Sequence, residues 1–397
     1  MVKIKIVFAA LALGAAAIAP AWQPAPKLPP PFHTPSASNR PRVITRPDGA
    51  RLQVPAGFNI DVYAEGFEVP RFMLAGPSGE ILLADSSRQT GAVWVLLDKK
   101  RTFKADDRKK LIEGLDRPYG LAFWNDFLYV AETTSVKRYK YDRKTMTVGK
   151  GEEVVPMHEF GQGHWTRSIL FDAKGEKFYL GIGSGSNVST GEPELRAAIS
   201  RYNPDGSGRE IVASGTRNPI GLRWYPGTNT LWAAVQERDG LGDDLVPDYF
   251  TSIKPGGFYG WPYAYIGPNE EPRNAGQRPD LVSKSIVPDL PLQAHVAVLD
   301  CQFYTGAQFP ERYRSGAFLA LHGSWNRSKR VGYSVVFVPF KNGKPAGAPE
   351  DFLTGWMLDP EQREVWGRPV GLLQMADGSL LVSEDGGNKV WRITYKR

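Results

Sequence analysis

One segment of the chain, residues 216–265, combines side chains that could bind and activate a flat, negatively charged ligand. It begins with the turn Arg217-Asn218-Pro219 and passes through two apolar runs that are typical of strands. An acidic loop follows from Glu237 to Asp244, and the segment closes on Tyr259-Gly260-Trp261-Pro262. Guanidinium groups bind carboxylates and phosphates, while carboxylates and loop carbonyls are the oxygen ligands that calcium prefers. The combination predicts a planar polyanionic cofactor held together with a hard cation.

The bulk composition predicts a large all-β protein. The chain has 397 residues with Gly 42, Pro 32, Trp 11 and Tyr 16, a mixture that favours many short strands joined by tight turns. The net charge is +7 with acids and bases interspersed, which argues for small anionic ligands more than for nucleic acid. Cys301 is the only cysteine, so a disulfide framework and a thiolate zinc site are excluded.

The N-terminus resembles an export signal. Lys3 and Lys5 precede an apolar stretch, and Ala19-Pro20-Ala21 has the small residues of a cleavage site. We therefore expect residues 1–21 to be a signal peptide, residues 22–50 a Pro-rich, poorly ordered linker, and residues 51–397 the folded domain. No later apolar run is long enough to cross a membrane, so we expect a periplasmic protein without stable membrane insertion.

A unit of short apolar strands, separated by Gly or Asn turns, recurs along the chain. Its last copy, PVGLLQMADGSLLVSEDGGNKVWRITY, is the clearest, and earlier copies begin near Pro70, Pro118, Trp165, Pro219 and Ala297. Recurrence at this period predicts propeller blades, with insertions in the fourth and fifth. The last copy lacks an outer strand, which Phe58–Ala64 could supply. We predict an all-β, six-bladed β-propeller closed by an N-terminal strand; a large β-sandwich, the alternative, does not require such regular spacing.

In a propeller, the turns that lead into the innermost strands open on one face around the axis. Each copy carries a basic or imidazole side chain there: Arg71, Arg117, His164 with Arg167, Arg217 with Asn218, His295, and Arg368. Any single one can be an ordinary turn or packing residue, but that reading does not predict their coincidence at equivalent positions. Arginines gathered in this way would repel one another without an anionic guest, so the pattern predicts a bound polycarboxylate or phosphate.

Other common chemistries lack their sequence motifs. No Gly-rich phosphate loop stands between a strand and a helix, which argues against NAD and ATP. Neither a nucleophile elbow nor a His-Glu-x-x-His pair is present. The acidic loop from Glu237 to Asp244 is consistent both with a calcium site and with a solvated surface loop, and composition alone does not separate the two.

Several motifs taken together resemble a known family. The chain contains, in this order, RNPxGL, ERDGLGDDL, YGWP, HGSWNR and GRPVG. This set is similar to the sorbosone dehydrogenase-like group of quinoprotein sugar dehydrogenases, which are relatives of soluble glucose dehydrogenase and fungal pyranose dehydrogenase. The likeness runs from about Pro55 to the end. It implies a six-bladed propeller that holds pyrroloquinoline quinone (PQQ) and calcium in an axial funnel and oxidises an aldose or a related, sorbosone-like sugar aldehyde.

The resemblance also implies roles for individual residues. His164 matches the family's catalytic base, and Arg217 with Asn218 matches residues that hold the reactive carbonyl side of the quinone, so that Arg217 takes part in catalysis as well. The further cofactor contacts that it implies are Arg71, Trp261, His322, Arg327 and Arg368. The calcium ligands that it implies are backbone or side-chain oxygens of Glu237, Arg238 and Asp239, with Asp243 or Asp244 nearby.

The chain departs from glucose dehydrogenases at three of these positions. Ser184 stands where they carry an aspartate that orients the histidine, and Trp366 replaces a second arginine of the last blade. A fifth-blade lysine is replaced by His322 or Arg327, and the sequence does not decide between the two. These changes leave the identity of the sugar substrate undetermined.

Two other functions are compatible with the same fold. A calcium-dependent lactonase would need axial carboxylates and a cation but no converging arginines. A non-catalytic carbohydrate-binding propeller would keep Trp261 and Trp325 to stack on sugar faces. For the dehydrogenase, the sequence has no haem-attachment Cys-x-x-Cys-His, so electrons would pass to a separate acceptor such as a cytochrome or the quinone pool.

Overall fold

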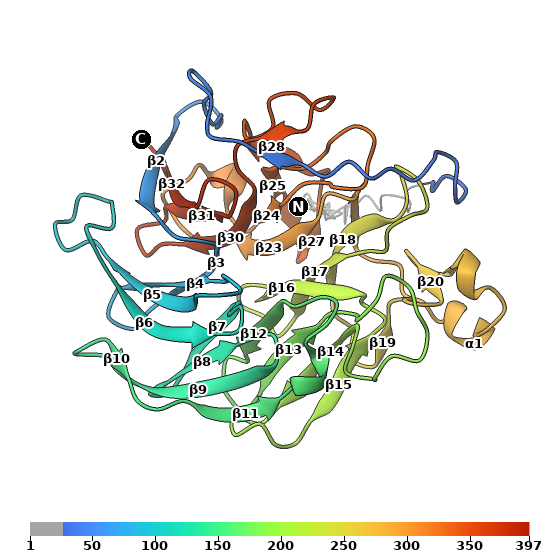
Figure 1. Cartoon of the computed structure of the whole chain (residues 1–397), viewed down its shortest axis with the longest axis horizontal. Coiled ribbons are helices and arrows are strands. Elements are labelled where there is room, and N and C mark those ends of the chain that lie inside the picture. The colour runs from blue at the N-terminus through green and yellow to red at the C-terminus, as the bar shows by residue number, and fades with distance from the viewer. Residues whose placement is uncertain (1–26, 397) are drawn as a thin grey trace, which may run out of the picture.

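The structure, a computed structural model, describes residues 27–396. Six sheets surround a central axis as the blades of a propeller (Figure 1). Their innermost strands are β3 (Pro70–Ala75), β7 (Gly120–Trp124), β12 (Arg167–Phe171), β16 (Asn218–Trp224), β23 (Val298–Phe303) and β30 (Pro369–Gln374). Each innermost strand begins at or close to the residue expected from the repeat, which confirms the predicted six-bladed propeller.

Each blade is built outward from its innermost strand. The first blade continues through β4 (Ile81–Asp85), β5 (Gly91–Leu97) and β6 (Asp107–Leu115). The second continues through β8 (Phe127–Ala131), β9 (Ser135–Asp142) and β11 (Glu152–Pro156), and β10 (Thr147–Val148) also pairs with β9. The third continues through β13 (Phe178–Ile182), β14 (Ala198–Tyr202), β15 (Glu210–Ser214) and β19 (Gly257–Phe258). The fourth blade continues through β17 (Leu231–Gln236), β18 (Pro247–Ser252) and β22 (Leu290–Ala294). The fifth continues through β24 (Ala317–Leu321), β25 (Ser334–Val338) and β28 (Glu350–Leu353). The sixth continues through β31 (Leu380–Glu384), β32 (Lys389–Tyr395) and β2 (Phe58–Glu65).

The ring is closed by an early strand, β2, and the last strand, β32. Strand β2 pairs antiparallel with β32, with Ile60 opposite Ile393. Figure 1 shows the blue β2 beside the dark red β32. This pairing gives the last blade its outer strand, and the backbone groups of β32 that would form an open edge are thereby satisfied.

Burial along the strands explains why the repeat is visible in the sequence. Every residue of β4 and of β31 is buried, because neighbouring blades cover both faces of these inner strands. Such strands therefore appear as short continuous apolar runs. The outer strand β6 is largely exposed and carries the polar sequence DRKKLIEGL.

Apolar side chains fill the axis at the level of the innermost strands. Phe72, Tyr119, Ile220, Leu299 and Val370 come from five different blades and belong to one buried cluster. The Tyr119 hydroxyl crosses the ring and donates to the Leu299 carbonyl oxygen at 3.0 Å, which satisfies a polar group that burial would otherwise penalise. Polar side chains at the beginnings of the innermost strands therefore have an apolar floor.

The N-terminal segment lies against the propeller. Phe32 N–H donates to Leu241 O at 2.9 Å, Asn39 N–H donates to Trp325 O at 2.7 Å, and β1 (Arg42–Val43) pairs in parallel with β29 (Glu364–Val365). The composition predicts a poorly ordered linker here; the difference arises because loops of the folded domain supply hydrogen-bond partners that local composition does not reveal. The expected signal peptide lies outside the described residues, and none of the helices within residues 27–396 is long and apolar enough to span a bilayer.

Candidate active site

His164 lies in the loop that leads into β12, and glycines let this loop pack closely on the end of β13. Gly163 has φ 76°, and a Cβ at this position would come within 2.4 Å of the Gly185 carbonyl oxygen. A Cβ on Gly183 would lie 2.6 Å from the His164 Cβ and 2.3 Å from Asn218 Oδ1. Side chains at these glycines would therefore push the imidazole out of its position.

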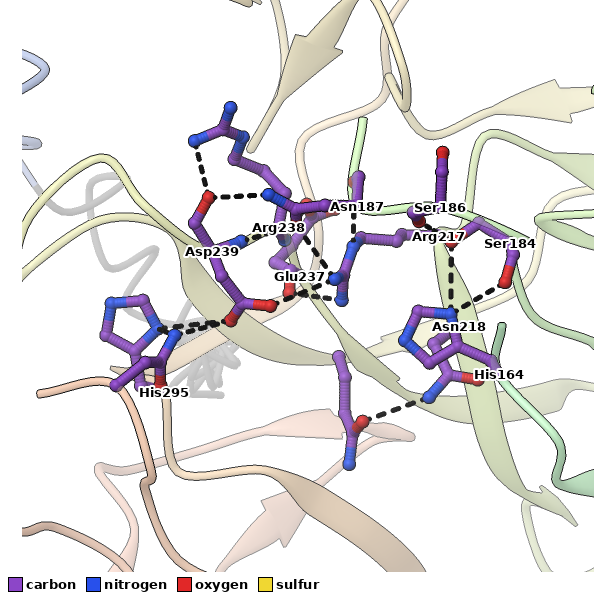
Figure 2. Close-up of polar contacts among 12 residues, drawn as sticks. His164, Ser184, Ser186, Asn187, Arg217, Asn218, Glu237, Arg238, Asp239 and His295 are labelled. Atoms are coloured by element: carbon purple, nitrogen blue, oxygen red, sulfur yellow. Dashed lines mark hydrogen bonds and ion pairs between the residues drawn. The ribbon is translucent and has the colours of Figure 1, made fainter. Parts of the chain in front are cut away.

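The imidazole of His164 is held through one of its nitrogens. Nδ1 lies 2.9 Å from the Ser184 carbonyl oxygen and 3.0 Å from Ser184 Oγ (Figure 2). Ser184 Oγ itself donates to Ser186 O at 2.6 Å, so Nδ1 must be the donor and carry the hydrogen. Nε2 then carries the lone pair, and it has no hydrogen-bond partner among residues 27–396. Ser184 thus orients the ring as a base.

The surroundings of His164 keep it uncharged. Its pKa is lowered from 6.5 to about 3, first by burial and then by the Arg217 guanidinium, with a further contribution from Arg196. The Ser184 carbonyl and the Asp239 carboxylate act in the opposite direction and are outweighed. A histidine pKa that folding lowers favours the native state above pH 6.5 and costs stability as the pH falls towards 3. His164 is therefore a neutral base at every pH near neutrality.

Two buried arginines lie behind this loop and donate to its backbone. Arg167 Nη1 donates to His164 O at 2.8 Å and its Nη2 to Phe160 O at 2.9 Å. Arg196 donates to Gly183 O at 3.1 Å and to Gln162 O at 2.7 Å. Neither guanidinium pairs with a carboxylate of the described chain. They hold the His164 loop in place and add positive charge beside the ring.

We expect NMR titration of the apo-protein to show that His164 stays neutral from pH 5 to 8. Replacing Arg196 by methionine removes a positive charge near the ring, so the pKa of His164 should rise towards that of an exposed histidine. Exposed His158, which pairs with Glu153 of β11, is the internal control, and its NMR signals should be the same in both proteins. Titration of His164 near pH 6.5 in the unaltered protein would contradict this picture.

Arg217 is fixed by four hydrogen bonds at the beginning of β16 (Figure 2). Nη1 donates to Glu237 O at 2.6 Å, and Nε donates to Asn187 O at 3.1 Å. Nη2 donates to Asn187 Oδ1 at 2.9 Å and to Asp239 Oδ2 at 3.1 Å. A guanidinium has five N–H groups, so one N–H on Nη1 is left for a ligand. Next to it, Asn218 donates to Gln236 Oε1 at 2.9 Å, while its buried Oδ1 has no partner.

Trp261 supports this arrangement from behind. Its Nε1 donates to the Asn187 carbonyl oxygen at 2.8 Å, and only 5% of the residue is exposed. It does not line the cavity next to His164. The indole therefore positions Asn187, and through it Arg217, instead of offering a face to a ligand.

A second imidazole, that of His295, lies on the other side of the cavity from His164. His295 Nε2 donates to Gly242 O at 2.9 Å, and its Nδ1 accepts from Asn326 Nδ2 at 3.1 Å. Asn326 Nδ2 also donates to Asp239 Oδ1 at 2.5 Å, which joins this side of the cavity to Arg217. The cavity between the His164 side and the His295 side has a volume of ≈ 80 Å³. It is lined by His164, Arg217, Gln236, Glu237, Asp239, Asp248, His295, Ala297, Trp325 and Asn326.

The carboxyl groups around the cavity differ in their ionisation. Burial raises the pKa of Glu237 to about 8, and its Oε1 is buried without a partner. Burial likewise raises the pKa of Asp248 to about 6. For Asp239, burial is outweighed by Arg217 and His295, and its pKa is lowered. Asp239 is thus the carboxyl group whose surroundings favour the ionised form, while burial favours the neutral form of Glu237.

A second group of cations surrounds Trp165, the residue after His164. The guanidinium carbons of Arg71 and Arg117 lie 5.0 Å and 5.3 Å from the centre of this indole. Arg71 pairs with Asp385, which His322 Nε2 also contacts at 2.9 Å. Arg368 donates to His322 O at 3.3 Å and to Gly323 O at 3.2 Å, and has no carboxylate partner within the described residues. The structure thus brings together most of the predicted cationic residues, from five blades.

The other predicted residues lie in different contacts. The Asp243 carboxylate accepts from Ser328 N–H at 2.9 Å, and Asp244 pairs with Arg327 at 2.8 Å. Arg327 is therefore part of the acidic loop's own contacts, and His322 is the residue that joins the Trp165 group. Arg238 pairs with buried Glu271 at 3.0 Å. Within residues 27–396, no cluster of three or more His, Cys, Asp or Glu side chains could hold a metal ion.

Four residues of the site were not predicted as functional. Asp248 had a signal, because it is a carboxylate inside the apolar run of β18, where burial requires a partner. Gln236 directly precedes the acidic loop, and Trp165 directly follows His164. Arg196 has no local signal, because only the fold places it behind the His164 loop.

The fold and these contacts define a six-bladed propeller with a half-buried neutral imidazole beside a network of arginines. Residues 52–246 and 274–396 match the TrAA12-like family, and the chain belongs to this family. It is 30% identical over 361 residues to an uncharacterized protein of Borreliella burgdorferi, covering 87% of this chain and 91% of the relative. It is 26% identical to the pyrroloquinoline quinone-dependent pyranose dehydrogenase of Coprinopsis cinerea, covering 86% of this chain but 54% of that protein.

Solved structures share the fold at lower identity. The calcium structure of a Trichoderma reesei carbohydrate-active enzyme of family AA12 matches with a TM-score of 0.76 and 22% identity, covering 90% of this chain and 100% of the other. The holo form of the PQQ domain of the Coprinopsis cinerea pyranose dehydrogenase matches with a TM-score of 0.74 and 22% identity, covering 89% and 99%. At this identity the likeness establishes the propeller fold.

Proposed function

We propose that the protein is a quinoprotein oxidoreductase that binds PQQ and oxidises an aldose or a related, sorbosone-like sugar aldehyde. The observation that carries the proposal is His164, a half-buried neutral base with its Nε2 free, in one cavity with Arg217. The family and the PQQ-dependent pyranose dehydrogenase among its relatives support the same assignment. Consistent with the export signal expected from the sequence, we place this activity in the periplasm.

The residues present fit a polycarboxylate cofactor. Arg167 and Arg196 are buried and Arg368 is half-buried, and none of the three guanidinium groups has a carboxylate partner in the described chain, which leaves positive charge that an anion would neutralise. The buried Nε of Arg71 has no hydrogen-bond partner, whereas Arg117 Nε lies 3.5 Å from Asp116 Oδ1. PQQ has three carboxylates, and Arg71, Arg217 and Arg368 would hold it, with Asn218 and His322 beside them. The ≈ 80 Å³ cavity holds only part of such a ligand.

The proton chemistry follows from the orientation of His164. When bound, PQQ supplies a quinone that accepts a hydride, that is two electrons and one proton, from the sugar carbon. His164 Nε2 would remove the proton from the sugar hydroxyl, and Ser184 would stabilise the resulting imidazolium through the Nδ1–H bond. The free N–H of Arg217 would donate to negative charge that develops on the bound ligand. Donors fixed in advance, as these are, need no rearrangement during the reaction.

In the proposed enzyme, only backbone oxygens are candidate ligands for calcium. The carboxylates of Asp243 and Asp244 are held by Ser328 and Arg327, and the Asp239 carboxylate is held by Arg217 and Asn326. The carbonyl oxygens of the Glu237–Asp239 loop are the remaining candidates, although Arg217 and Arg238 donate to two of them. We assign no catalytic step to a metal.

The test is reconstitution of purified apo-protein with PQQ, in parallel with calcium and with EDTA. We expect an aldose or sugar aldehyde to drive reduction of an artificial electron acceptor only in samples that contain PQQ. Equal activity with calcium and with EDTA would remove calcium from the proposal. Lactone hydrolysis without quinone would favour a lactonase instead, and sugar binding without dye reduction would favour a carbohydrate-binding propeller.

A further inference from the structure

One tryptophan differs from all the others that the structure describes. Trp325 is 39% exposed, whereas every other tryptophan within residues 27–396 is buried or half-buried. A large aromatic side chain in solvent costs the hydrophobic stabilisation that burial would provide. In a protein that otherwise covers its indoles, an exposed one beside a cavity indicates a surface that a ligand covers.

The backbone that carries this indole is rigid. Asn39 N–H donates to Trp325 O at 2.7 Å on one side of the residue. On either side of Trp325, Ser324 N–H donates to Val331 O at 3.0 Å, and the Asn326 side chain donates to Asp239 and to His295. The exposure of Trp325 is therefore a property of an ordered loop and does not come from a frayed end.

The indole lies at the mouth of the proposed active site. Trp325 lines the same cavity as His164 and Asp239, and it is the most exposed of the residues that line this cavity. The guanidinium carbon of Arg40 lies 5.4 Å from its ring centre. Arg40 belongs to the N-terminal segment, which Asn39 fastens by donating from Nδ2 to Arg327 O at 3.1 Å and Ser328 O at 2.8 Å. The segment thus forms part of the rim.

An aromatic face beside a guanidinium matches the chemistry of a pyranose ring. The C–H groups on one face of a pyranose pack on an aromatic ring, and its surrounding hydroxyls accept hydrogen bonds from guanidinium N–H groups. Trp325 opens to solvent, whereas the reacting sugar must reach His164 within the cavity. We propose that Trp325 and Arg40 form a second saccharide subsite, so that the substrate is a saccharide longer than one ring, oxidised at the ring that lies next to His164.

This inference rests on the proposed function, and its test separates the two. Holoenzyme would be assayed with glucose and with its disaccharides cellobiose and maltose. We expect Trp325→Ala to lower kcat/KM for the better disaccharide by about tenfold and to lower the value for glucose by a clearly smaller factor, since Trp325 also lines the cavity that the reacting ring enters. Arg40→Ala should act in the same direction with a smaller effect, and Trp325→Phe should restore most of the loss. Phe103→Ala is the matched control, because Phe103 is exposed under Arg392, at 4.4 Å, outside this cavity.

Calorimetry of disaccharide binding to the apo-protein gives a readout that does not need the quinone. If no sugar is oxidised but Trp325→Ala still abolishes disaccharide binding, the subsite stands and the dehydrogenase assignment fails. Equal losses for glucose and disaccharide would instead place Trp325 against the cofactor or the reacting ring and overturn the subsite. Unchanged kinetics and unchanged binding in the Trp325→Ala protein would overturn it as well.

Discussion

Replacing His164 by alanine is expected to lower turnover of the PQQ-loaded protein by ~10²–10⁴-fold, the usual contribution of general-base catalysis. The physical reason is that Nε2 is the free nitrogen of a ring that Ser184 holds through Nδ1. PQQ affinity should stay nearly unchanged, because the guanidinium groups that would bind its carboxylates remain in place. Fluorescence titration with PQQ and steady-state kinetics measure the two effects separately.

His158→Ala is the control for this experiment. His158 is also a histidine beside blade 3, but its side chain is 69% exposed and pairs with Glu153 away from the cavity. Its replacement should leave both turnover and PQQ affinity as they are. Normal turnover of a His164→Ala holoenzyme would show that another group takes the proton, and the assignment of the base would then be wrong.

Replacing Arg217 by methionine is expected to have the largest effect on cofactor binding. Arg217 joins Asn187, Glu237 and Asp239, and its side chain is 6% exposed. Removing Arg217 takes away the ion-pair partner of the Asp239 carboxylate, which is 26% exposed and still accepts from Asn326, so we expect a loss of about 1–3 kcal/mol of folding free energy. PQQ affinity should fall by about a hundredfold or more, because the N–H left for a ligand is lost as well. Denaturant unfolding and PQQ titration check the two values.

Arg201→Met is the matched control for Arg217. Arg201 also lies in a propeller strand and pairs with a carboxylate, that of Glu210, but both side chains of this pair are exposed to solvent. Surface ion pairs contribute little to stability, so neither unfolding nor PQQ binding should change measurably. An Arg217→Met protein that keeps its PQQ affinity would remove this arginine from the cofactor site. Loss of stability alone, with affinity intact, would leave it a structural residue.

Local sequence pattern was sufficient for the propeller and for several positions of the site. The second strands of the blades, such as β4 and β31, are buried on both faces, so their short apolar runs recur at a visible period. That period located Arg71, Arg217 and Arg368 at equivalent turns, and these arginines do lie around the axis. The replacement of an orienting aspartate by Ser184 was also readable, and the contact between Ser184 and His164 Nδ1 is present.

The partners of these side chains could not be read from local pattern. Asp243 and Asp244 looked like metal ligands, yet they bind Ser328 and Arg327, which are far away in the sequence. Trp261 looked like part of the cavity wall, yet it lies behind Asn187. In the same way, the composition of the N-terminal segment predicted a poorly ordered linker. The loops to which this segment hydrogen-bonds come from blades four and five, so its own sequence does not reveal these partners.

The difference has one physical cause. Strand periodicity and turn residues act between neighbours in the chain, so the amino-acid order alone specifies six blades and a basic residue at the beginning of most innermost strands. Hydrogen bonds and ion pairs depend on distances of about 3 Å between atoms of different blades, and these distances exist only after the ring has closed. The closed ring therefore determines which arginines pair with carboxylates of the chain and which remain available to a ligand, and it turns the half-buried His164 into a neutral base.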